Sequence, residues 1–412
     1  MAGAGPAGLA AALFMHRAGC KVTIFEQFDA PKPVGSGLIL QPTGLTVLDK
    51  LGLLGAIMAL GARIDRLFGQ DALSRRTVLD VSYVVQKRGR FGLAVHRAAL
   101  FSVLFKAVQD AGITVATAAR LTDIEPASAG IAVVSENGQR IGGFDLVVDA
   151  SGARSLLRRH AVAPSAPTPL TYGAFWATLN WPADGFAANT LSQRYDKASV
   201  MIGVMPIGRA SAGGNPKAAF FWSLKPQDAG AIQAAGLVAW KERVLSMWPE
   251  CAPLMDQLSN WGQLTLARYG HHTISQPVGP RLAIVGDAAH STSPQLGQGA
   301  NMALLDACAL AHAIEVSTDM ETALGAYAAA RRLHVRVFQT MSKFLTPLYQ
   351  SDSTFLPFVR DRLVATAAKV PPAPGLLASL VAGTIVDPFR PIGLTETDWN
   401  KVRGDAPKSQ VR

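Results

Sequence analysis

Cysteine is scarce in this chain, and the few cysteines present form no recognisable pattern. Cys20, Cys251 and Cys308 are the three thiols among 412 residues, and no Cys-x-x-Cys pair occurs. An odd number of unpatterned thiols argues against a disulfide framework and against a zinc site, so no metal is expected. Such cysteine usage is typical of a reducing compartment, and we therefore expect a cytoplasmic protein.

Long apolar runs and dense charge are also missing. A membrane-spanning helix needs about 18 apolar residues, and the longest late candidate, 375–386, is shorter and holds two glycines. Charged residues make up 17% of the chain and hydrophobic residues 49%, which excludes an intrinsically disordered protein. The length allows one large core or two closely joined domains.

The net charge of +10 is spread along the chain. No basic run with interleaved aromatic residues occurs, so nucleic acid is not an expected partner. The positive field can favour an anionic small molecule or contact with an anionic membrane surface, or it can be ordinary surface charge. These alternatives stay open, as does the oligomeric state.

A glycine-rich turn opens the chain. GAGPAG, over 3–8, is a G-x-G-x-x-G followed by an apolar helix-like run, a strand-like run and then Glu26. In this dinucleotide fingerprint Gly3 makes the tight turn, Gly5 lets the backbone approach a pyrophosphate, and Gly8 lets the helix pack on the sheet. Glu26 can accept hydrogen bonds from an adenosine ribose. The expected dinucleotide-binding residues are Gly3, Gly5, Pro6, Ala7, Gly8 and Glu26.

The strand that should precede this fingerprint is missing. Only Met1 and Ala2 stand before Gly3, whereas a strand in the middle of a parallel sheet needs about five residues. We therefore expect the natural protein to begin several residues upstream, with a strand rich in Val and Ile.

The segment 286–307, GDAAHSTSPQLGQGANMALLDA, combines a carboxylate, a glycine-rich loop and a helix start. Asp287 follows the short apolar run 282–285, which is typical of a buried strand. Gly297 and Gly299 carry no Cβ and can let the backbone come close to a flat ligand. Apolar spacing from Gly299 onward predicts a helix, whose first N–H groups favour an anion or electron-rich ring atoms.

With these motifs, the chain resembles the class A flavoprotein monooxygenases, the para-hydroxybenzoate hydroxylase-like family of FAD-dependent aromatic hydroxylases. The resemblance extends from residue 3 to about residue 383 and rests on three motifs in the family's order. They are GAGPAG with Glu26, DLVVDASGARSLLRR over 145–159, and GDAAH…P..GQGAN.A..DA over 286–307.

Two shorter segments support the resemblance and imply further site residues. HRAAL, over 96–100, stands where the family carries an arginine that reaches FAD, and GSGLILQP, over 35–42, resembles the segment beneath the flavin. The resemblance implies that Asp287 bonds a ribityl hydroxyl and that the helix start faces the pyrimidine edge of the ring. Pro294 would fix the loop beside the reacting carbon, which is the only catalytic role assigned. The remaining expected cofactor-binding residues are Gly37, Arg97, Gly286, Asp287, Pro294, Gly297, Gly299, Ala300 and Asn301.

The middle motif departs from the family. Ser151 stands where the usual sequence has an aspartate that is thought to help bind both FAD and the nicotinamide cofactor. Asp149 can substitute in part only if the strand continues, because residues i and i+2 then share a face. The arginines that follow can contact the cofactor or form a solvated basic turn. They are Arg154, Arg158 and Arg159.

The implied activity is that of an FAD-dependent monooxygenase with NAD(P)H as co-substrate. NAD(P)H reduces FAD, O2 and the reduced flavin give a C4a-hydroperoxide, and hydroxyl passes to a small aromatic or related electron-rich substrate. Alternatives are an FAD-dependent reductase or dehydrogenase of the prenyl-reductase type, which the change at Ser151 allows, and a non-catalytic flavin-binding protein. A halogenase is disfavoured because WATLNWP, over 176–182, does not match the halogenase motif Trp-x-Trp-x-Ile-Pro.

The sequence does not single out a substrate base. A Tyr, His or Arg near the ring hydroxyl would help a phenol to ionise. His290 is more readily interpreted as a residue that supports its loop than as a catalytic acid. The candidates for the base are Tyr172, Tyr195, Tyr269, His271 and His272.

The positions of the motifs predict an α/β fold with a discontinuous, Rossmann-like FAD-binding domain. An inserted antiparallel β-sheet would bind the substrate, and a helical C-terminal region with a flexible tail would follow over 346–412. The FAD-binding domain is expected over 1–70, 90–165 and 275–345. The substrate-binding domain is expected over 71–89 and 166–274. Strand-like composition occurs in 172–181, 199–206 and 218–224.

Overall fold

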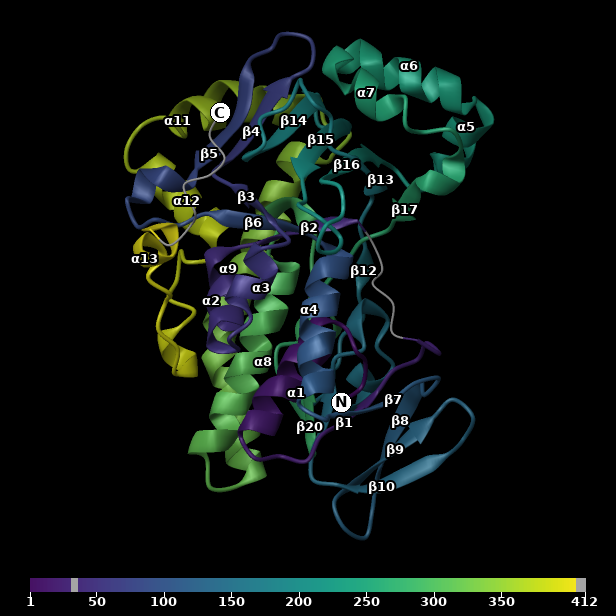
Figure 1. The fold of residues 1–412 in the computed structure, drawn as a ribbon, viewed down its shortest axis with the longest axis vertical. Coiled ribbons are helices and arrows are strands. Elements are labelled where there is room, and N and C mark those ends of the chain that lie inside the picture. The colour runs from purple at the N-terminus through teal and green to yellow at the C-terminus, as the bar shows by residue number, and fades with distance from the viewer. Residues whose placement is uncertain (31–35, 405–412) are drawn as a thin grey trace.

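The computed structural model describes residues 1–30 and 36–404 (Figure 1). Gly35, from the segment expected beneath the flavin, and residues 405–412 of the expected tail lie outside the described residues. Within the described part, no helix has both the length and the apolar character that a membrane crossing requires. The three cysteines are free thiols.

One half of the molecule is built on a mainly parallel sheet, close to the N-terminus in Figure 1. Two parallel strand pairs form it, and one antiparallel strand closes its edge. These strands supply the apolar runs that the sequence places before Glu26 and before Asp287. In spatial order they are β7 (Thr114–Ala116), β1 (Thr23–Phe25), β11 (Val147–Asp149), β20 (Leu282–Ile284) and β19 (Val278–Gly279).

Ala2 joins the two strand pairs. It forms parallel bridges to Phe25 on one side and to Asp149 on the other. Its N–H donates to Val148 O over 2.8 Å, and the N–H of Phe25 donates to Met1 O over 2.8 Å. The two residues before the glycine-rich turn therefore supply the main-chain hydrogen bonds at the place where a longer strand was expected. The upstream strand itself stays a prediction.

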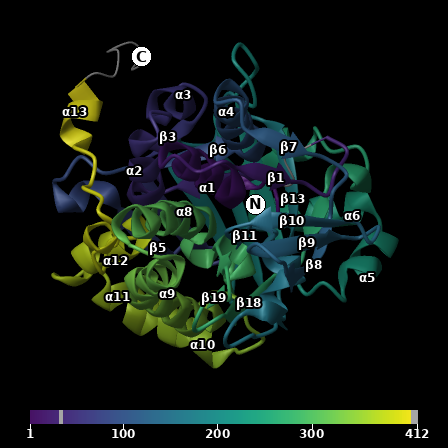
Figure 2. The ribbon, with the colours of Figure 1, turned by 90° about the horizontal axis from the view of Figure 1, so that it is seen from below.

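Helices cover one face of this sheet, and the antiparallel meander over 121–144 packs against the other face. Figure 2 shows α1 (Pro6–Arg17), α8 (Gly299–Val316) and α9 (Met320–Tyr349) side by side, and α4 (Arg97–Asp110) packs on the other flank of α1. α1 is rich in Ala and Leu, and its residues from Ala7 to Met15 are buried. Because small side chains allow close helix–helix approach, α1 fits between its neighbours in the largest hydrophobic core.

The other half of the molecule contains a seven-stranded sheet, at the top of Figure 1. Adjacent strands within this sheet run antiparallel to each other, except β14 and β4, which run parallel to each other. The strands expected over 172–181, 199–206 and 218–224 are confirmed as β13, β15 and β16. The spatial order is β17 (Thr265–Ala267), β13 (Gly173–Asn180), β16 (Lys217–Leu224), β15 (Val200–Pro206), β14 (Thr190–Asp196), β4 (Arg66–Asp71) and β5 (Thr77–Ser82).

The expected boundary at residue 70 falls inside β4 of this sheet. β4 pairs with β14 over its whole length, from Arg66 opposite Thr190 to Asp71 opposite Tyr195. The pairing partner lies more than a hundred residues away, so local composition did not reveal it. At the other end, α9 continues through Pro347 and passes the expected boundary at residue 345.

The two faces of the seven-stranded sheet are covered differently. One face packs against α5 (Ala229–Ala234), α6 (Leu237–Met247) and α7 (Ala252–Met255), with Trp222 and Trp240 in the core between them. The other face packs against β2 (Gly37–Leu40) and α12 (Ala373–Ala382). This second face turns toward the part of the molecule that carries the glycine-rich motifs.

Smaller elements connect the two halves. β2, β3 and β6 form one small sheet, β8 to β10 form an antiparallel meander, and β18 pairs with β12 and β21 between the two large sheets. The expected helical C-terminal region is present. The remaining bounds are β3 (Ala62–Ile64), β6 (Gly92–His96), β8 (Leu121–Pro126), β9 (Ile131–Ser135), β10 (Arg140–Phe144), β12 (Thr168–Pro169), β18 (Gly270–Thr273), β21 (His290–Ser291), α2 (Pro42–Lys50), α3 (Leu54–Met58), α10 (Phe355–Val359), α11 (Ala365–Ala367) and α13 (Trp399–Gly404).

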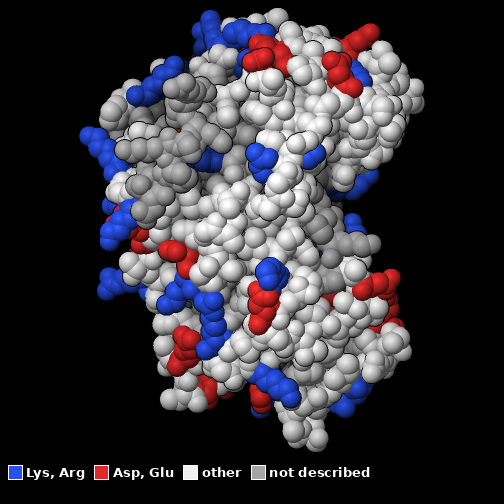
Figure 3. All heavy atoms as spheres, in the orientation of Figure 1, with Lys and Arg blue, Asp and Glu red and all other residues white. Residues whose placement is uncertain are grey.

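Figure 3 shows how charge is distributed on one face of the molecule. In the lower half, basic and acidic side chains alternate, whereas basic side chains prevail at the upper left. The middle of this face carries few charges. The net charge of +10 therefore does not gather in a single patch on this face.

Candidate functional site

The glycine-rich turn after Ala2 leads into α1 at the end of the parallel sheet. Gly3 has a φ of 99°, and a Cβ there would lie 2.8 Å from Ala150 O. A Cβ at Gly8 would lie 2.0 Å from Gly3 O, so this glycine is required by packing. Among the described residues no atom lies within 4 Å of a Cβ built at Gly5, so space is open before the first turn of α1. The turn is a backbone cradle whose N–H groups suit a pyrophosphate.

Glu26 holds this turn in place from the end of β1. Its side chain is buried, Oε2 accepts the Ala4 N–H over 2.7 Å, and Oε1 accepts the Phe28 N–H over 3.1 Å. A carboxylate has about four acceptor positions, so the bond to a ribose stays a prediction that the geometry allows. That Glu26 also fixes the turn was not foreseen from the sequence.

Asp287 follows β20 and offers its carboxylate to open space. The Asp287 side chain is reached by solvent, but the protein around it still removes part of the water from the carboxylate. This desolvation raises the pKa of the Asp287 carboxyl, while the charges of His290 and Arg97 act in the opposite direction. A Cβ at Gly299 would lie 3.7 Å from Asp287 Oδ1, so the carboxylate lies beside the start of α8. No protein donor bonds it within the described residues, which leaves both oxygens for ligand hydroxyls.

The start of α8 contains the predicted loop and helix residues. Pro294 is exposed and begins a short 3-10 turn, after which Gly297 adopts a φ of 60°. Gly299 and Ala300 are the first residues of the helix, and N–H groups of a first helical turn have no intrahelical acceptor. They are therefore available to a ligand beside Asp287.

The side chain of Asn301 points away from this opening. It is fully buried, its Oδ1 accepts the Gln41 N–H over 2.8 Å, and its Nδ2 donates to Gly297 O over 2.8 Å and to Ile39 O over 3.1 Å. The Asn301 amide therefore ties the start of α8 to β2 and to the glycine loop. Only its backbone N–H remains for the predicted ligand contact.

Two predicted residues on neighbouring elements have different surroundings. Gly37 is buried, and a Cβ there would lie 2.5 Å from Ile207 Cγ2, so packing on the seven-stranded sheet already requires glycine. Arg97 is exposed at the first position of α4, and its charge acts on both Asp287 and Tyr269. Arg97 is therefore close enough to both Asp287 and Tyr269 for its charge to lower the pKa of each.

Tyr269 lies at an aromatic wall of the seven-stranded sheet. Trp176 Nε1 donates to the Tyr269 hydroxyl over 2.7 Å, and the rings of Trp176 and Phe221 lie 4.8 Å apart. Burial raises the pKa of the Tyr269 phenol to about 12. The hydrogen bond from Trp176 and the charge of Arg97 lower this pKa, but their effect is smaller than that of burial. At neutral pH this phenol is protonated, so it can donate a hydrogen bond but cannot serve as a general base.

The other candidates for a substrate base have protein partners or different positions. The Tyr172 hydroxyl donates to Asp352, and the fully buried Tyr195 donates to Gln193. The buried ring of His272 contacts Ser291 Oγ, Ala288 O and Arg158 Nη1, and His271 lines a separate cavity. Among the five candidates, Tyr269 is the one whose pKa the charge of Arg97 acts to lower.

Behind the Asp287 loop, a buried cluster of charges holds the motif together. Asp306 Oδ2 lies 2.6 Å from His290 Nε2 and accepts the Gly286 N–H over 2.8 Å, while Oδ1 lies 2.7 Å from Arg331 Nε. Burial alone would raise the pKa of the Asp306 carboxyl, but the charges and hydrogen bonds of His290 and Arg331 hold it well below its usual range. This arrangement agrees with the interpretation of His290 as a loop support.

Neither Asp306 nor Arg331 could be selected for this role from the sequence alone. Asp306 stands in the motif over 286–307, but as one of several residues of a predicted helix. Arg331 lies on α9, 25 residues further along the chain. Only the packing of α9 against α8 brings the two side chains together.

The structure corrects the expectation that Asp149 could replace the missing aspartate. Asp149 is fully buried, its Oδ1 accepts the Ser151 hydroxyl over 2.5 Å, and its Oδ2 accepts the Ser155 hydroxyl over 2.5 Å. The carboxylate is therefore used within its own turn. Ser151 is exposed but carries no charge, so neither position presents a free carboxylate to this edge of the site.

The arginines of the middle motif do not form one solvated turn. Arg154 and Arg159 are exposed, and Arg159 pairs with Asp123 over 2.7 Å. Arg158 is buried, donates to Ala153 O over 2.5 Å and contacts His272 Nε2 over 3.1 Å. The solvated interpretation is therefore wrong for Arg158, because its guanidinium satisfies the carbonyls of the turn.

The buried His272 predicts an acid-sensitive fold. Burial lowers the pKa of His272 to about 4, so between pH 6.5 and 4 the unfolded chain binds more protons than the native protein. The free energy of unfolding should fall with decreasing pH by no more than about 1.4 kcal/mol per pH unit from this group. Denaturation of H272N at several pH values should show a shallower acid decline than the unmodified protein. If the free energy of unfolding fell equally with decreasing pH in both proteins, the pKa of His272 would be the same in the folded and the unfolded chain.

An exposed carboxylate beside a helix start, a glycine cradle at the end of a parallel sheet and a facing antiparallel sheet suit a flat dinucleotide cofactor and a second ligand. The chain belongs to the FAD binding domain family, which matches residues 1–341. Its relatives are class A flavin monooxygenases, so the predicted family and the enzyme class of FAD-dependent monooxygenase are confirmed.

Particular relatives and structures give the extent of the likeness. The chain is 26% identical to aurachin C monooxygenase/isomerase of Stigmatella aurantiaca, over 88% of this chain and 92% of the relative. It is 26% identical to 3-hydroxybenzoate 6-hydroxylase 1 of Aquipseudomonas alcaligenes, over 84% and 87%. The fold is similar to that of tetrameric 2-methyl-3-hydroxypyridine-5-carboxylic acid oxygenase, with a TM-score of 0.77, 19% identity and coverage of 96% and 97%. The fold is also similar to that of HpxO of Klebsiella pneumoniae complexed with FAD and uric acid. The TM-score is 0.75, the identity is 21%, and the likeness covers 93% of this chain and 96% of HpxO.

Proposed function

We propose that this protein is an NAD(P)H- and FAD-dependent hydroxylase of a small aromatic or heteroaromatic compound. The observation that carries the proposal is the exposed Asp287 carboxylate beside the free start of α8, with the charge of Arg97 acting on both Asp287 and Tyr269 of the aromatic wall. One side of this arrangement suits the flavin, and the other suits a ring to be hydroxylated.

The proposed FAD site follows the residues that have room for a ligand. The N–H groups of the cradle at Gly5 would hold the pyrophosphate, Glu26 would bind the adenosine ribose, and Asp287 would bind a ribityl hydroxyl. The free N–H groups of Gly299 and Ala300 would face the electron-rich edge of the ring and stabilise negative charge there by a few kcal/mol. When bound, FAD supplies the redox chemistry that accepts hydride from NAD(P)H and activates O2.

The domain division is proposed on the same grounds. The parallel sheet with α1, α4, α8 and α9 would form the discontinuous, Rossmann-like FAD-binding domain. The seven-stranded sheet would form the substrate wall, with β4 added to the pieces expected over 71–89 and 166–274. Pro294, exposed in the loop before α8 and without an N–H, would lie between the flavin and the substrate.

The substrate class is inferred from the aromatic wall and the relatives. Trp176 and Phe221 offer ring faces, Arg97 offers a positive charge, and the protonated Tyr269 hydroxyl offers a donor. A planar ring with a hydroxyl, oxo or carboxylate group satisfies all of them. Curated relatives named for 3-hydroxybenzoate and for urate hydroxylation support the same kind of ring.

Tyr269 provides a specific prediction for substrate binding. In Y269F the ring and its packing remain, but the donor to the substrate is lost, so KM for the aromatic substrate should rise by roughly three- to tenfold. FAD binding should be unchanged, because Tyr269 does not touch the glycine turn or α8. Steady-state kinetics with saturating NAD(P)H measures the first effect, and fluorescence titration with FAD measures the second. An unchanged KM would remove Tyr269 from the substrate site.

The visible absorption spectrum tests the proposed function. Protein loaded with FAD should show flavin bands that bleach slowly on addition of NADH or NADPH, and faster when a suitable phenol or hydroxylated heterocycle is added. NAD(P)H oxidation that yields a reduced product without uptake of O2 would point to the reductase alternative. Bound FAD that no NAD(P)H reduces, with any tested ring compound, would point to a non-catalytic flavin-binding protein.

A further inference from the structure

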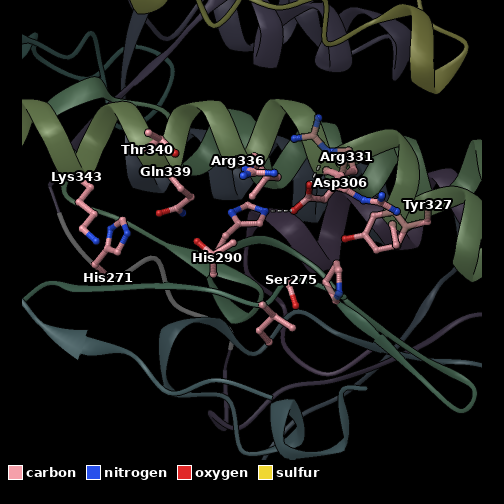
Figure 4. Close-up of a pocket in the computed structure, with 16 residues that line it drawn as sticks. His271, Ser275, His290, Asp306, Tyr327, Arg331, Arg336, Gln339, Thr340 and Lys343 are labelled. Atoms are coloured by element: carbon pink, nitrogen blue, oxygen red, sulfur yellow. Dashed lines mark hydrogen bonds and ion pairs between the residues drawn. The ribbon is translucent and has the colours of Figure 1, made fainter. Parts of the chain in front are cut away.

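A cavity of about 410 Å³ opens along α9 (Figure 4). Its walls are formed by one side of α9, by β18 and by the connection from β18 to β19. His290 and Asp306 of the buried charge cluster form part of its lining, but Gly5, Asp287 and Gly299 do not. The volume is in the range of small-molecule sites, which is roughly 300–1,000 Å³.

The cavity is strongly basic. Four cationic side chains of α9 line it, and the single acidic residue of its lining, Asp306, is already paired with Arg331 and His290. The other three cations, Arg332, Arg336 and Lys343, are exposed and form no ion pair within the described residues. Figure 4 shows Lys343 beside His271 at one end of the cavity and Arg331 beside Tyr327 at the other. The four cations are Arg331, Arg332, Arg336 and Lys343.

Two residues of the lining each carry a buried polar atom that has no hydrogen-bond partner among the described residues. Arg331 is 1% exposed and its Nη1 forms no hydrogen bond, and Gln339 is 5% exposed and its Oε1 accepts none. Buried polar groups are nearly always hydrogen-bonded, so an unpaired donor and an unpaired acceptor on residues of one cavity suit a ligand that offers a partner to each. That ligand needs an anionic acceptor for Arg331 and a hydroxyl or amino donor for Gln339.

Between these polar groups the wall is apolar. Ile274, Pro277 and Val335 line the same cavity. A flat ring fits such a wall, while phosphate groups fit the basic side chains, because arginine and lysine bind phosphate by charge-assisted hydrogen bonds. A phosphorylated nucleoside combines the ring, the hydroxyl donors and the anionic groups in one molecule.

We propose that this cavity binds the adenosine-phosphate part of NAD(P)H. The proposal rests on the proposed function, in which NAD(P)H is a co-substrate. The chain has one glycine-rich dinucleotide fingerprint, over 3–8, and the FAD would occupy it. The second dinucleotide therefore needs an anion-binding site elsewhere, and the basic cavity on α9 supplies one.

Direct binding of NADP⁺ to the FAD-loaded protein tests the proposal. NADP⁺ cannot donate hydride, so calorimetric titration measures binding without turnover. In the double variant Arg336→Gln/Lys343→Gln, the Kd for NADP⁺ should rise by about tenfold or more, because two charge-assisted phosphate contacts are lost. Both side chains are exposed and without ion-pair partners in the described chain, so the variant should fold. Q339L should also weaken binding, by loss of the buried acceptor.

A matched control removes the same charge elsewhere. In Lys21→Gln/Arg88→Gln, two exposed cations that do not line the cavity are lost, and the Kd for NADP⁺ should stay within about twofold of the unmodified value. Equal affinities in the two double variants would overturn the proposal. Inorganic phosphate that binds as tightly as NADP⁺ and loses affinity in the same cavity variant would assign the site to free phosphate instead. A change in sedimentation confined to the cavity variant, with unchanged NADP⁺ affinity, would make the cavity a contact between copies and overturn the proposal.

The test distinguishes this proposal from the proposed function. Loss of NADP⁺ affinity in the cavity variant supports the site even if no aromatic compound is hydroxylated. Hydroxylation by a protein whose NADP⁺ affinity does not depend on Arg336 and Lys343 supports the function and overturns the site.

Discussion

Replacement of Asp306 by alanine is expected to lower the free energy of unfolding by about 3–5 kcal/mol, because it leaves buried charge without a partner. Asp306 is fully buried and binds Arg331, His290 and the N–H of Gly286 at once. Its loss leaves the Arg331 guanidinium without a counter-charge in the interior. Chemical denaturation of FAD-free D306A and of the unmodified protein measures the difference.

An exposed aspartate provides the matched control for D306A. Asp184 is exposed and has no ion pair or hydrogen bond in the described chain, so D184A should change stability by no more than about 0.5 kcal/mol. D306A should also bind FAD more weakly than D184A, since Asp306 holds the loop that carries Asp287. A D306A protein as stable as D184A would show that the cluster does not hold the two helices together.

Substitution of Gly5 by valine should abolish FAD binding while the fold remains intact. A Cβ at Gly5 would meet no protein atom within 4 Å, and its backbone has an ordinary extended conformation with φ of −72°. The valine side chain would therefore occupy the space proposed for the pyrophosphate. We expect the Kd for FAD to rise by at least about a hundredfold, equal to about 2.7 kcal/mol. Fluorescence titration with FAD measures the affinity, and denaturation measures the stability.

Two other glycines separate the ligand effect from a packing effect. G8V should unfold the protein, because a Cβ at Gly8 would lie 2.0 Å from Gly3 O. G325V, on the exposed side of α9 with no atom near its Cβ, should leave FAD binding unchanged. If G5V bound FAD as tightly as G325V, the pyrophosphate would not lie in the glycine cradle.

Local sequence patterns were sufficient where a feature depends on neighbouring residues. The glycine-rich turn, the helix start after Gly297 and the strands β13, β15 and β16 each follow from residue types within one short segment. In these places backbone conformation and hydrophobic spacing leave few alternatives. The α/β class and the family followed from the same short motifs.

Features that depend on distant partners could not be predicted. The parallel pairing of β4 with β14 and the contact between Asp306 and Arg331 each join segments with no common pattern in the sequence. Asp149 was misjudged for a related reason: the spacing placed it near the site, but burial and the hydroxyls of Ser151 and Ser155 assign its carboxylate to the turn. Burial decides such cases, and burial is a property of the assembled fold.

Isotope transfer from ¹⁸O2 distinguishes hydroxylation by this protein from the reductase and binding-protein alternatives. The protein is loaded with FAD and supplied with NAD(P)H and a phenol or hydroxylated heterocycle that accelerates its oxidation. A hydroxylase predicts a product heavier by one ¹⁸O atom under ¹⁸O2, and no label in the product when only the water carries ¹⁸O. Oxygen in the product that comes from water, or a product without added oxygen, would contradict the account.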